Sequence, residues 1–223
     1  MKMTQPLKLG VLISGSGSNL QSIIDNIENG KLSAIIKVVI CNNPHSFGIT
    51  RAQKHGLPVV VLKHDDFCTR EDFDKELIRI LRINEIDLVV LAGFMRILTP
   101  VFLKAFPQRI INIHPALLPS FPGTHGPKDA FEYGVKFSGC TVHFVDEGVD
   151  TGPIIIQSIV PVLQNDTKET LAARILKEEH KIYSQAIQFF AEGRIIMSGR
   201  KVQIKDVAEI NLLALHNPSL TDF

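Results

Sequence analysis

Short apolar runs that alternate with amphipathic stretches are the feature that most constrains the fold of this chain. The runs are apolar throughout, rather than at every second position, at residues 7–14, 35–41, 58–62, 87–92 and 109–113. Strands that are buried on both faces of a parallel sheet have this pattern. Helical spacing and helix-end residues mark the intervening stretches at residues 19–29, 47–55, 70–83 and 100–106. This order predicts an α/β fold with a doubly wound, mostly parallel sheet.

The pattern changes after His114. Residues 116–128 are rich in Pro and Gly and are predicted to form a loop, whereas residues 137–145 and 154–162 are predicted strands of a hairpin or antiparallel extension. Residues 168–192 then read as one long amphipathic helix. We therefore expect a single domain over residues 1–197, followed by a loosely attached tail over residues 198–223.

Composition excludes several classes of protein. Lys and Arg number 24 against 23 Asp and Glu, so the chain has no excess of positive charge with which to hold a nucleic acid. Cys41, Cys68 and Cys140 are far apart and form no Cys-x-x-Cys motif, which argues against a zinc knuckle or a disulfide scaffold. Neither a signal peptide nor a membrane span is recognisable, and we expect a cytoplasmic protein.

A Gly/Ser loop lies between the first predicted strand and the first predicted helix. Gly17, Ser18 and Asn19 stand where the free N–H groups and the positive dipole end of the helix meet a ligand. Such a loop suits one phosphate, with an ordinary tight turn as the alternative. Leu20 occupies the place of the third glycine of a dinucleotide fingerprint, and no Gly-Lys-Ser/Thr follows, so neither a nicotinamide cofactor nor ATP is indicated.

An amide and an imidazole lie at the end of the fifth predicted strand. Asn112 and His114 are two residues apart and therefore point to the same side, and Pro115 favours an extended His114. Together they suit the stabilisation of an oxyanion at a carbonyl group. Asp150 is a candidate to orient His114 or to raise its pKa. A hydrogen-bonded loop histidine is the alternative.

The residues around this pair exclude two other chemistries. No Gly-x-Ser-x-Gly motif and no cysteine accompany the histidine, so covalent catalysis is not expected. Asp146, Glu147 and Asp150 are close in sequence, but neither His-Glu-x-x-His nor an EF-hand spacing occurs. We expect no metal site.

Two charged residues break local rules. Glu179 falls on the apolar face of the long helix and needs a ligand or an ion-pair partner there. Arg70 opens its predicted helix, where a cation opposes the dipole, so it either faces an anion or is an ordinary surface arginine.

The segment from Leu91 to Leu98 leaves the fourth parallel strand. Gly93 permits close approach of a ligand, and Met95, Ile97 and Leu98 suit a flat apolar wall for an aromatic ligand. Packing into the core is the alternative.

Taken together, these motifs resemble the phosphoribosylglycinamide formyltransferases, a family of folate-dependent enzymes. The resemblance extends over about residues 7 to 195 and rests on Gly15-Ser16-Gly17-Ser18-Asn19-Leu20, Leu91-Ala92-Gly93-Phe94-Met95-Arg96-Ile97-Leu98, Asn112-Ile113-His114-Pro115, Leu117-Leu118-Pro119, Val142-His143-Phe144-Val145 and Asp150-Thr151-Gly152-Pro153. Asn-x-His-Pro and Leu-Leu-Pro alone mark only the wider formyltransferase superfamily.

The resemblance implies a Rossmann-like formyltransferase fold and two small-molecule substrates. A formyl group passes from 10-formyltetrahydrofolate to the amine of 5-phosphoribosylglycinamide, in de novo purine biosynthesis. The implied ligands of the substrate phosphate are Gly17, Ser18 and Asn19, with Glu179 near the same substrate. The implied folate-binding residues are Arg70, Met95, Arg96, Ile97, Leu98, Asn112, Val145 and Asp146. A homodimer is left open.

The implied mechanism is a direct attack of the amine on the formyl carbon. Asn112 and protonated His114 stabilise the oxyanion, and Asp150 supports the imidazolium and organises a water for proton transfer. The family also implies a cis peptide before Pro119. Pro127 stands where some relatives carry a second histidine, which puts a role for that position in doubt.

Three other functions compete with this one. Methionyl-tRNA formyltransferase shares the Asn-x-His-Pro core but is expected to need a tRNA-binding extension and a basic surface, whereas this chain has a short tail and balanced charge. Formyltetrahydrofolate deformylase usually carries an N-terminal regulatory domain, whereas the predicted catalytic domain begins by Leu7. A non-catalytic phosphoribosyl-ligand sensor has no use for the Asn112, His114 and Asp150 set.

Overall fold

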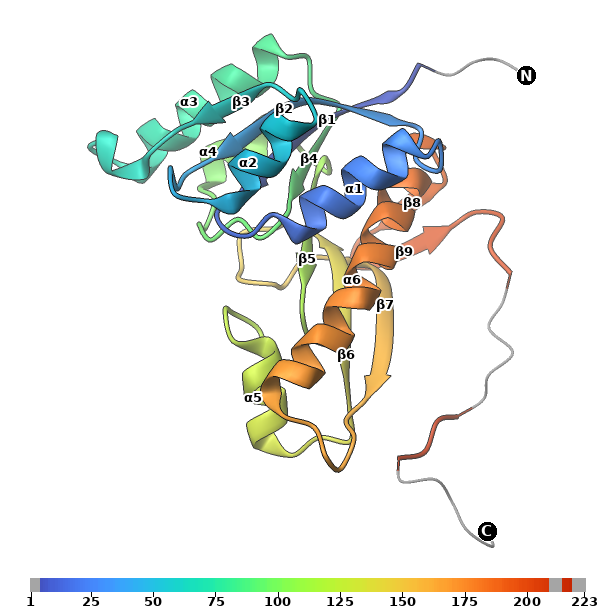
Figure 1. The fold of residues 1–223 in the computed structure, drawn as a ribbon. Coiled ribbons are helices and arrows are strands. Elements are labelled where there is room, and N and C mark those ends of the chain that lie inside the picture. The colour runs from blue at the N-terminus through green and yellow to red at the C-terminus, as the bar shows by residue number, and fades with distance from the viewer. Residues whose placement is uncertain (1–4, 209–213, 218–223) are drawn as a thin grey trace, which may run out of the picture.

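The computed structural model describes residues 5–208 and 214–217, and it contains a seven-stranded sheet and a separate two-stranded sheet (Figure 1). The strands are β1 (Leu7–Ile13), β2 (Ala34–Cys41), β3 (Val59–Val61), β4 (Leu88–Leu91), β5 (Ile110–His114), β6 (Phe137–Phe144), β7 (Ile154–Pro161), β8 (Ile195–Ser198) and β9 (Lys201–Ile204). The helices are α1 (Ser18–Glu28), α2 (Phe47–Lys54), η1 (His64–Asp66), α3 (Arg70–Ile83), α4 (Pro100–Ala105), α5 (Gly126–Tyr133) and α6 (Lys168–Ala191).

The large sheet has the order β3-β2-β1-β4-β5-β6-β7, and its first five strands run parallel. The chain leaves β1 toward β2 and later returns to β4 on the other side of β1, so the winding direction reverses there. Ligands of doubly wound folds bind in the crevice at the carboxyl ends of the strands at such a point. The predicted mostly parallel sheet is confirmed, as is the antiparallel extension, because β6 pairs antiparallel with both β5 and β7.

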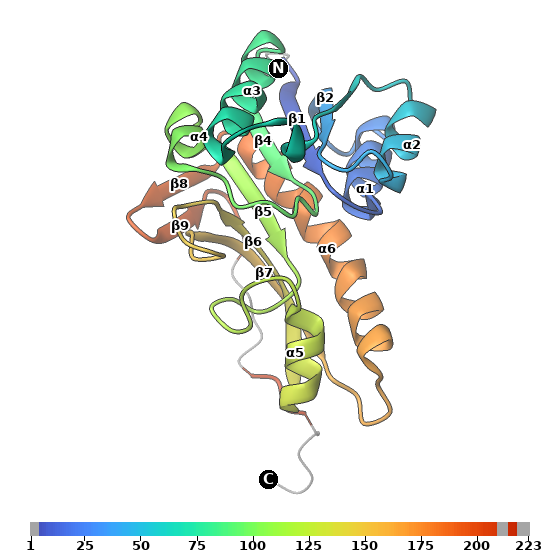
Figure 2. The ribbon, with the colours of Figure 1, turned by 90° about the vertical axis from the view of Figure 1, so that its left-hand side faces the viewer.

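Helices cover both faces of this sheet. Figure 2 shows α1, α2 and α6 on one side and α3 and α4 on the other. The first layer buries side chains such as Leu20 and Tyr183, and the second buries Leu77 and Phe102. Burial on both faces explains why the parallel strands are apolar at successive positions.

Two elements lie where no element was expected. Helix α5 begins inside the predicted loop, and its first turn contains Pro127, which tolerates that place because the first helical N–H groups have no intrahelical acceptor. It ends at Gly134, whose φ of 82° closes the helix in the left-handed conformation. The Gly and Pro residues of this segment are therefore helix-end signals rather than signs of a longer loop.

The second unexpected element is the β8–β9 hairpin, which crosses the predicted domain boundary at residue 198. Its side chains Ile195, Met197, Val202 and Ile204 pack against the core that contains α6. Further along, Asn217 Nδ2 donates hydrogen bonds to the carbonyl oxygens of Lys136 at 2.6 Å and Val162 at 2.9 Å. Residues 209–213 and 218–223 of the predicted tail lie outside the described residues.

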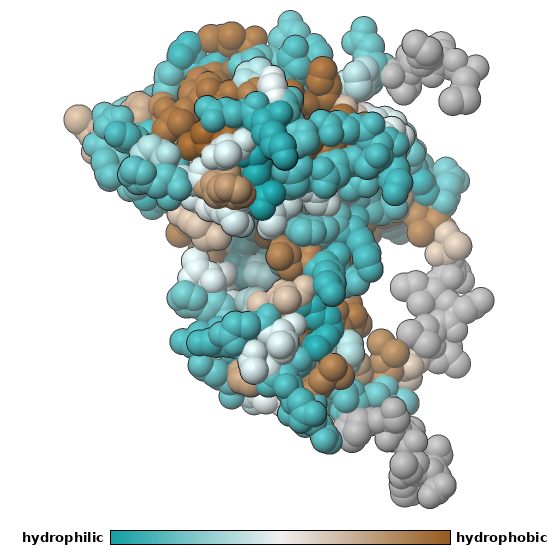
Figure 3. All heavy atoms as spheres, viewed as in Figure 1, coloured by the Kyte–Doolittle hydropathy of each residue, from teal (hydrophilic) through white to brown (hydrophobic). Residues whose placement is uncertain are grey.

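The surface in the view of Figure 3 is hydrophilic over most of α1 and α6. Apolar side chains gather toward the end of the molecule that carries β2, β3 and α3, elements whose exposed large apolar residues are Ile35, Val61 and Ile83. Among the helices that the structure describes, none is long and apolar enough to cross a bilayer.

Candidate active site

A cavity of about 380 Å³ lies at the carboxyl ends of β4 and β5. Its walls come from the segment after β4, from the end of β5 and from the loop between β6 and β7. The predicted site residues among its lining are Met95, Arg96, Ile97, Leu98, Asn112, His114, Val145, Asp146 and Asp150. Residues more than 50 positions apart in the sequence thus share one cavity of the size that small-molecule sites have.

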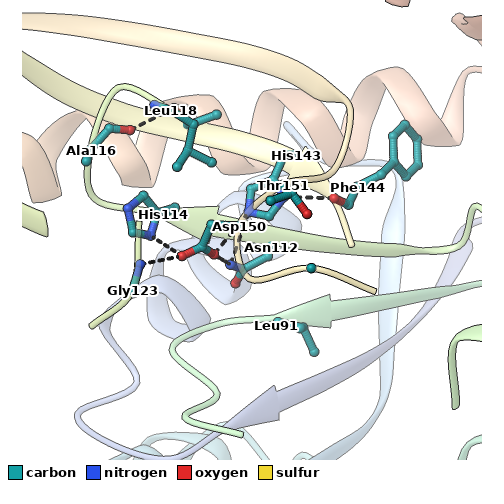
Figure 4. Close-up of polar contacts among 12 residues, drawn as sticks. Leu91, Asn112, His114, Ala116, Leu118, Gly123, His143, Phe144, Asp150 and Thr151 are labelled. Carbon is teal, nitrogen blue, oxygen red and sulfur yellow. Dashed lines mark hydrogen bonds and ion pairs between the residues drawn. The ribbon is translucent and has the colours of Figure 1, made fainter. Parts of the chain in front are cut away.

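His114 is the most deeply buried polar side chain at this cavity after His143, with 3% of its surface exposed. Its Nε2 lies 2.8 Å from the carbonyl oxygen of Phe121, and its Nδ1 lies 3.3 Å from Oδ2 of Asp150. Figure 4 shows the imidazole and the Asp150 carboxylate facing each other beside Asn112. Both ring nitrogens therefore face an acceptor, and only the doubly protonated ring can donate to both.

Asp150 lies at the centre of the polar cluster, although it comes from the loop before β7. Its φ of 55° is unusual for a residue other than glycine. Oδ2 accepts a 2.8 Å hydrogen bond from the Gly123 N–H, while Oδ1 lies 3.4 Å from Asn112 Nδ2 and 3.6 Å from His143 Nε2. The carboxylate thus joins β5, β6 and the loop that contains Gly123.

Burial and the charge of Asp150 shift the pKa of His114 in opposite directions. Burial lowers its pKa and outweighs the Asp150 charge, which raises it together with the hydrogen bond to Phe121. Asp150 thus acts on the pKa in the direction expected from the sequence, but the net shift is downward. The protonated form of His114 is consequently disfavoured in the free protein. The depth at which this ring is buried cannot be read from the sequence.

Asp150 itself stays ionised to low pH. Burial would raise its pKa, but interactions with His143, the Gly123 N–H and His114 together lower it. A fixed negative charge is therefore available to any imidazolium that forms at His114.

His143 also belongs to the cluster, although it is not among the predicted site residues. It lies on β6 directly opposite Asn112 on β5, and only 2% of its surface is exposed. Its Nδ1 lies 2.7 Å from the Phe144 carbonyl oxygen and its Nε2 lies 3.3 Å from Asn112 Nδ2. With the proton on Nδ1, Nε2 accepts from the amide and fixes the orientation of Asn112. A histidine between the apolar residues Val142 and Phe144 of a predicted strand is the signal that marks it in the sequence.

The segment after β4 forms an apolar wall of the cavity. Met95 and Ile97 expose 63% and 58% of their surfaces, so the alternative that they pack into the core is wrong for these two. Leu98 lines the cavity but is itself buried, at 7% exposed. The segment is held to β1, because Ser14 N–H donates to the Gly93 carbonyl at 3.1 Å and Met95 N–H donates to Ser14 Oγ at 2.8 Å.

Arg70 does not line this cavity. It lies at the start of α3 and its Nη2 donates a 2.8 Å hydrogen bond to the carbonyl oxygen of Ile97. In this structure Arg70 therefore supports the apolar wall from outside the cavity.

The Gly/Ser loop follows the carboxyl end of β1, and its residues are not among those that line the cavity. Gly17, with a φ of 70°, is the N-cap of α1, and among the described residues no side chain caps this helix. The first-turn N–H groups therefore stay available to a ligand. Asn19 Nδ2 instead donates a 2.8 Å hydrogen bond to Oε2 of Glu179, so α6 closes one side of the loop.

Glu179 is buried, at 7% exposed. Burial raises its pKa, and the hydrogen bond from Asn19 opposes that shift. Its partner is a neutral amide rather than a cation, which leaves a carboxylate oxygen free to accept from another group. The ion pair considered as the alternative from the sequence is not found among the described residues.

The described residues contain no group of three or more His, Cys, Asp or Glu side chains that could hold a metal ion. The absence of a metal stays a prediction. The cis peptide implied by the resemblance is present between Leu118 and Pro119.

The model of the formyl transferase family matches residues 7–187 of this chain. Phosphoribosylglycinamide formyltransferase of Escherichia coli is 43% identical over 191 residues, which are 86% of this chain and 90% of that protein. The crystal structure of glycinamide ribonucleotide transformylase 1 from Symbiobacterium toebii has a TM-score of 0.89 and 48% identity, and the match covers 91% of this chain and 95% of that one.

A longer relative matches over one segment only. The trifunctional purine biosynthetic protein adenosine-3 of Drosophila melanogaster is 47% identical over 193 residues, which are 86% of this chain but 14% of that protein. This chain therefore spans only a small part of the length of that relative.

Proposed function

The chain belongs to the formyl transferase family, and we propose that it transfers a formyl group from 10-formyltetrahydrofolate to the amine of 5-phosphoribosylglycinamide in purine biosynthesis. The observation that carries this proposal is the position of Asn112, His114 and Asp150 at the inner end of a cavity with an apolar wall, beside a helix N-terminus suited to a phosphate. The folate donor needs the apolar wall, and the phosphorylated acceptor needs the phosphate subsite.

The donor fits the apolar cavity. The exposed side chains of Met95 and Ile97 offer a flat surface to the fused rings of the folate, and Val145 and Asp146 contribute from the loop after β6. Backbone and carboxylate groups of such a loop can fix the orientation of a heterocycle through hydrogen bonds. Arg96 and Leu98 complete the set that we assign to the donor, with Arg70 supporting the wall.

The acceptor phosphate fits the Gly17–Asn19 loop. The uncapped first turn of α1 presents N–H groups and the positive end of the helix dipole. Glu179, whose free oxygen remains an acceptor, lies on the side of the loop where the hydroxyl groups of the ribose would need partners. The amine of the acceptor then reaches across the carboxyl ends of β1 and β4 toward the Asn112 and His114 cluster.

Transfer requires that the amine nitrogen forms a bond to the formyl carbon while the bond from that carbon to the folate nitrogen breaks. Negative charge develops on the formyl oxygen, and the amine passes a proton to the folate nitrogen. Asn112 Nδ2 and a His114 N–H are the donors that stabilise the oxyanion. In the free protein His114 Nε2 faces Phe121, so one His114 N–H must leave its present acceptor to take this role.

Asp150 contributes through charge and position. It orients Asn112 and His114 at once, and its carboxylate favours protonation of His114 as negative charge develops nearby. A water held by the carboxylate would carry the proton from the amine to the folate nitrogen. Proximity of the two bound substrates supplies a further share of the rate.

The test is an assay of the purified protein with 10-formyltetrahydrofolate and three acceptors: 5-phosphoribosylglycinamide, methionyl-tRNA and water. Formylation of the phosphoribosylglycinamide alone is the expected result. Transfer to methionyl-tRNA, or release of formate without an acceptor, identifies one of the two rival enzymes. Binding of the phosphoribosyl ligand without any turnover identifies a sensor.

Location and assembly stay predictions of the same proposal. We expect a cytoplasmic enzyme without a nucleic-acid partner, and light scattering of the purified protein decides between a monomer and a homodimer.

A further inference from the structure

One arginine outside the predicted site lies against the Gly/Ser loop. Arg51 is on α2, and its Nε donates a 2.9 Å hydrogen bond to the carbonyl oxygen of Ser16. Among the described residues it is the only cationic side chain with a hydrogen bond to residues 14–19. Nothing in the sequence singled it out, because it belongs to another helix.

The packing of α2 brings Arg51 to this position. Gly48, in the first turn of α2, donates its N–H to the Gly15 carbonyl at 3.1 Å, and a Cβ added at Gly17 would lie 2.6 Å from Gly48 Cα. The same added Cβ would lie 3.5 Å from Cδ of Arg51. Two glycines therefore allow the loop and α2 to come so close that the arginine stem runs along the loop backbone.

The guanidinium is held in place by contacts on several sides. It lies 4.9 Å from the ring centroid of Phe47, and Nη1 donates a 3.4 Å hydrogen bond to Gln21 on the second turn of α1. Nη2 has no hydrogen bond within the part of the chain that the structure describes. An oriented guanidinium with free N–H groups is suited to a phosphate oxygen.

The Arg51 charge also reaches α6. Burial lowers the pKa of His180, Asp25 opposes that shift, and Arg51 adds to it. His180 follows Glu179, the residue that closes the other side of the loop. The guanidinium consequently lies near the place where α1, α2 and α6 meet at the loop.

A phosphate monoester bound at the loop is stabilised further by such a cation. It carries close to two negative charges near neutral pH, and the loop supplies only N–H groups and a partial positive charge. The carboxyl group of Glu179 also lies at the loop, and its ionised form has the wrong sign for binding a phosphate. A positively charged donor beside the loop offsets the negative charge of the phosphate and that of an ionised Glu179.

We propose that Arg51 is a substrate-binding residue that pairs with the phosphate of the acceptor and makes the enzyme selective for the phosphorylated acceptor. This inference rests on the proposed function. It predicts selectivity for the phosphorylated ribosylglycinamide over the corresponding riboside, which has the same amine and sugar but no charge at that position.

The test compares Arg51→Gln with wild type for both acceptors. Gln keeps a donor for the Ser16 carbonyl but removes the charge. We expect KM for the phosphorylated acceptor to rise about 10- to 100-fold, as the loss of a charge-assisted hydrogen bond predicts, with KM for the riboside and for the folate unchanged. Arg51→Lys should recover part of the loss. Lys54→Gln is the matched control, because Lys54 is an exposed cation on the same helix.

Two outcomes overturn the inference. An unchanged KM for the phosphorylated acceptor in Arg51→Gln shows that the phosphate does not use this residue. An equal rise for both acceptors shows that Arg51 only supports the loop.

A second readout separates this inference from the proposed function. Inorganic phosphate should raise the melting temperature of wild type and of Lys54→Gln but not that of Arg51→Gln. Equal stabilisation of all three overturns the inference, whatever the formyl-transfer assay gives. Absence of transfer to the phosphorylated acceptor by wild type, with the phosphate effect intact, overturns the proposed function alone.

Discussion

Asp150 and His114 form a buried pair in which the carboxylate Oδ2 lies 3.3 Å from the imidazole Nδ1. The other ring nitrogen of His114 faces the Phe121 carbonyl oxygen at 2.8 Å, so the ring has two acceptors and, when neutral, one proton to share between them. Burial lowers the pKa of the ring and so favours its neutral form, whereas Asp150 and the Phe121 carbonyl favour the charged form. A developing negative charge beside the ring shifts this balance toward the imidazolium.

The first prediction concerns the imidazole itself. His114→Ala removes an oxyanion donor and should lower kcat for formyl transfer about 10²- to 10⁴-fold. Circular dichroism and a cooperative melt should show that the variant stays folded. His45→Ala, which removes an exposed imidazole, serves as the control and should keep wild-type turnover. Near-normal turnover in His114→Ala would exclude the mechanism.

The second prediction concerns the carboxylate. Asp150→Asn keeps an acceptor for the Gly123 N–H but removes the charge that raises the pKa of His114. The pKa of His114 should therefore fall further below its ordinary value, and an NMR titration of the imidazole protons measures it. In Glu147→Gln, an exposed carboxylate of the same loop is neutralised as a control. A His114 pKa that stays the same or rises in Asp150→Asn contradicts the pairing.

Much of this site could be predicted from the sequence because its residues sit on elements with strong patterns. Asn112 and His114 end an apolar parallel strand, and the edge that they reach follows from the parallel order alone. The strand that carries His143 pairs antiparallel with β5, and the register that brings His143 opposite Asn112 cannot be read from one sequence. The same limit applies to Gly123, whose N–H reaches Asp150 from a loop.

The net pKa shifts and the partners of the buried charged groups could not be predicted from the sequence. The net pKa shift of His114 depends on how much of the ring is buried, and the partner of Glu179 depends on which face of α1 meets α6. Arg51 was missed for a similar reason, because close packing of Gly17 against Gly48 is a tertiary contact. Local motifs identify residue types suited to a chemistry, whereas packing decides which charges meet.

The third prediction concerns the loop backbone. Gly17→Ala places a methyl group 2.6 Å from Gly48 Cα at a φ of 70°, so the loop must shift away from α2. We expect a loss of about 1–3 kcal/mol in the free energy of unfolding and a higher KM for the phosphorylated acceptor. Gly15→Ala is the stability control, since no atom lies within 4 Å of its added Cβ. Equal unfolding free energies for the two variants would refute this account of the loop.

The fourth prediction concerns the layer beneath the cavity. The Tyr183 hydroxyl on α6 lies 3.0 Å from the Leu91 carbonyl oxygen and 3.1 Å from that of Ile111, so it joins α6 to β4 and β5. Tyr183→Phe should cost about 1–2 kcal/mol of unfolding free energy in urea, with KM for both substrates nearly unchanged. Tyr133→Phe, at a side chain that is 79% exposed, should be neutral. A neutral Tyr183→Phe would show that the bond contributes nothing net.

The last prediction uses the pH dependence of stability at Glu179. Burial raises the pKa of this carboxyl in the folded protein, so its contribution to stability is full below the unfolded pKa and is lost as the pH rises through the folded pKa. Glu179→Gln keeps an acceptor for Asn19 without this titration. The variant should therefore gain stability relative to wild type as the pH rises above the ordinary pKa of a glutamate, as urea unfolding at a series of pH values would measure.

The exposed Glu132 on α5 provides the control, because Glu132→Gln makes the same chemical change away from the core. Its stability difference from wild type should vary less with pH than that of Glu179→Gln. The kinetic side of the same variant tests the proposed role of Glu179, since a neutral amide is a weaker acceptor for a ribose hydroxyl and should raise KM for the acceptor but not for the folate. A difference in unfolding free energy that does not change with pH would mean that Glu179 is ionised at little cost in the folded protein, with Asn19 and solvent offsetting its burial.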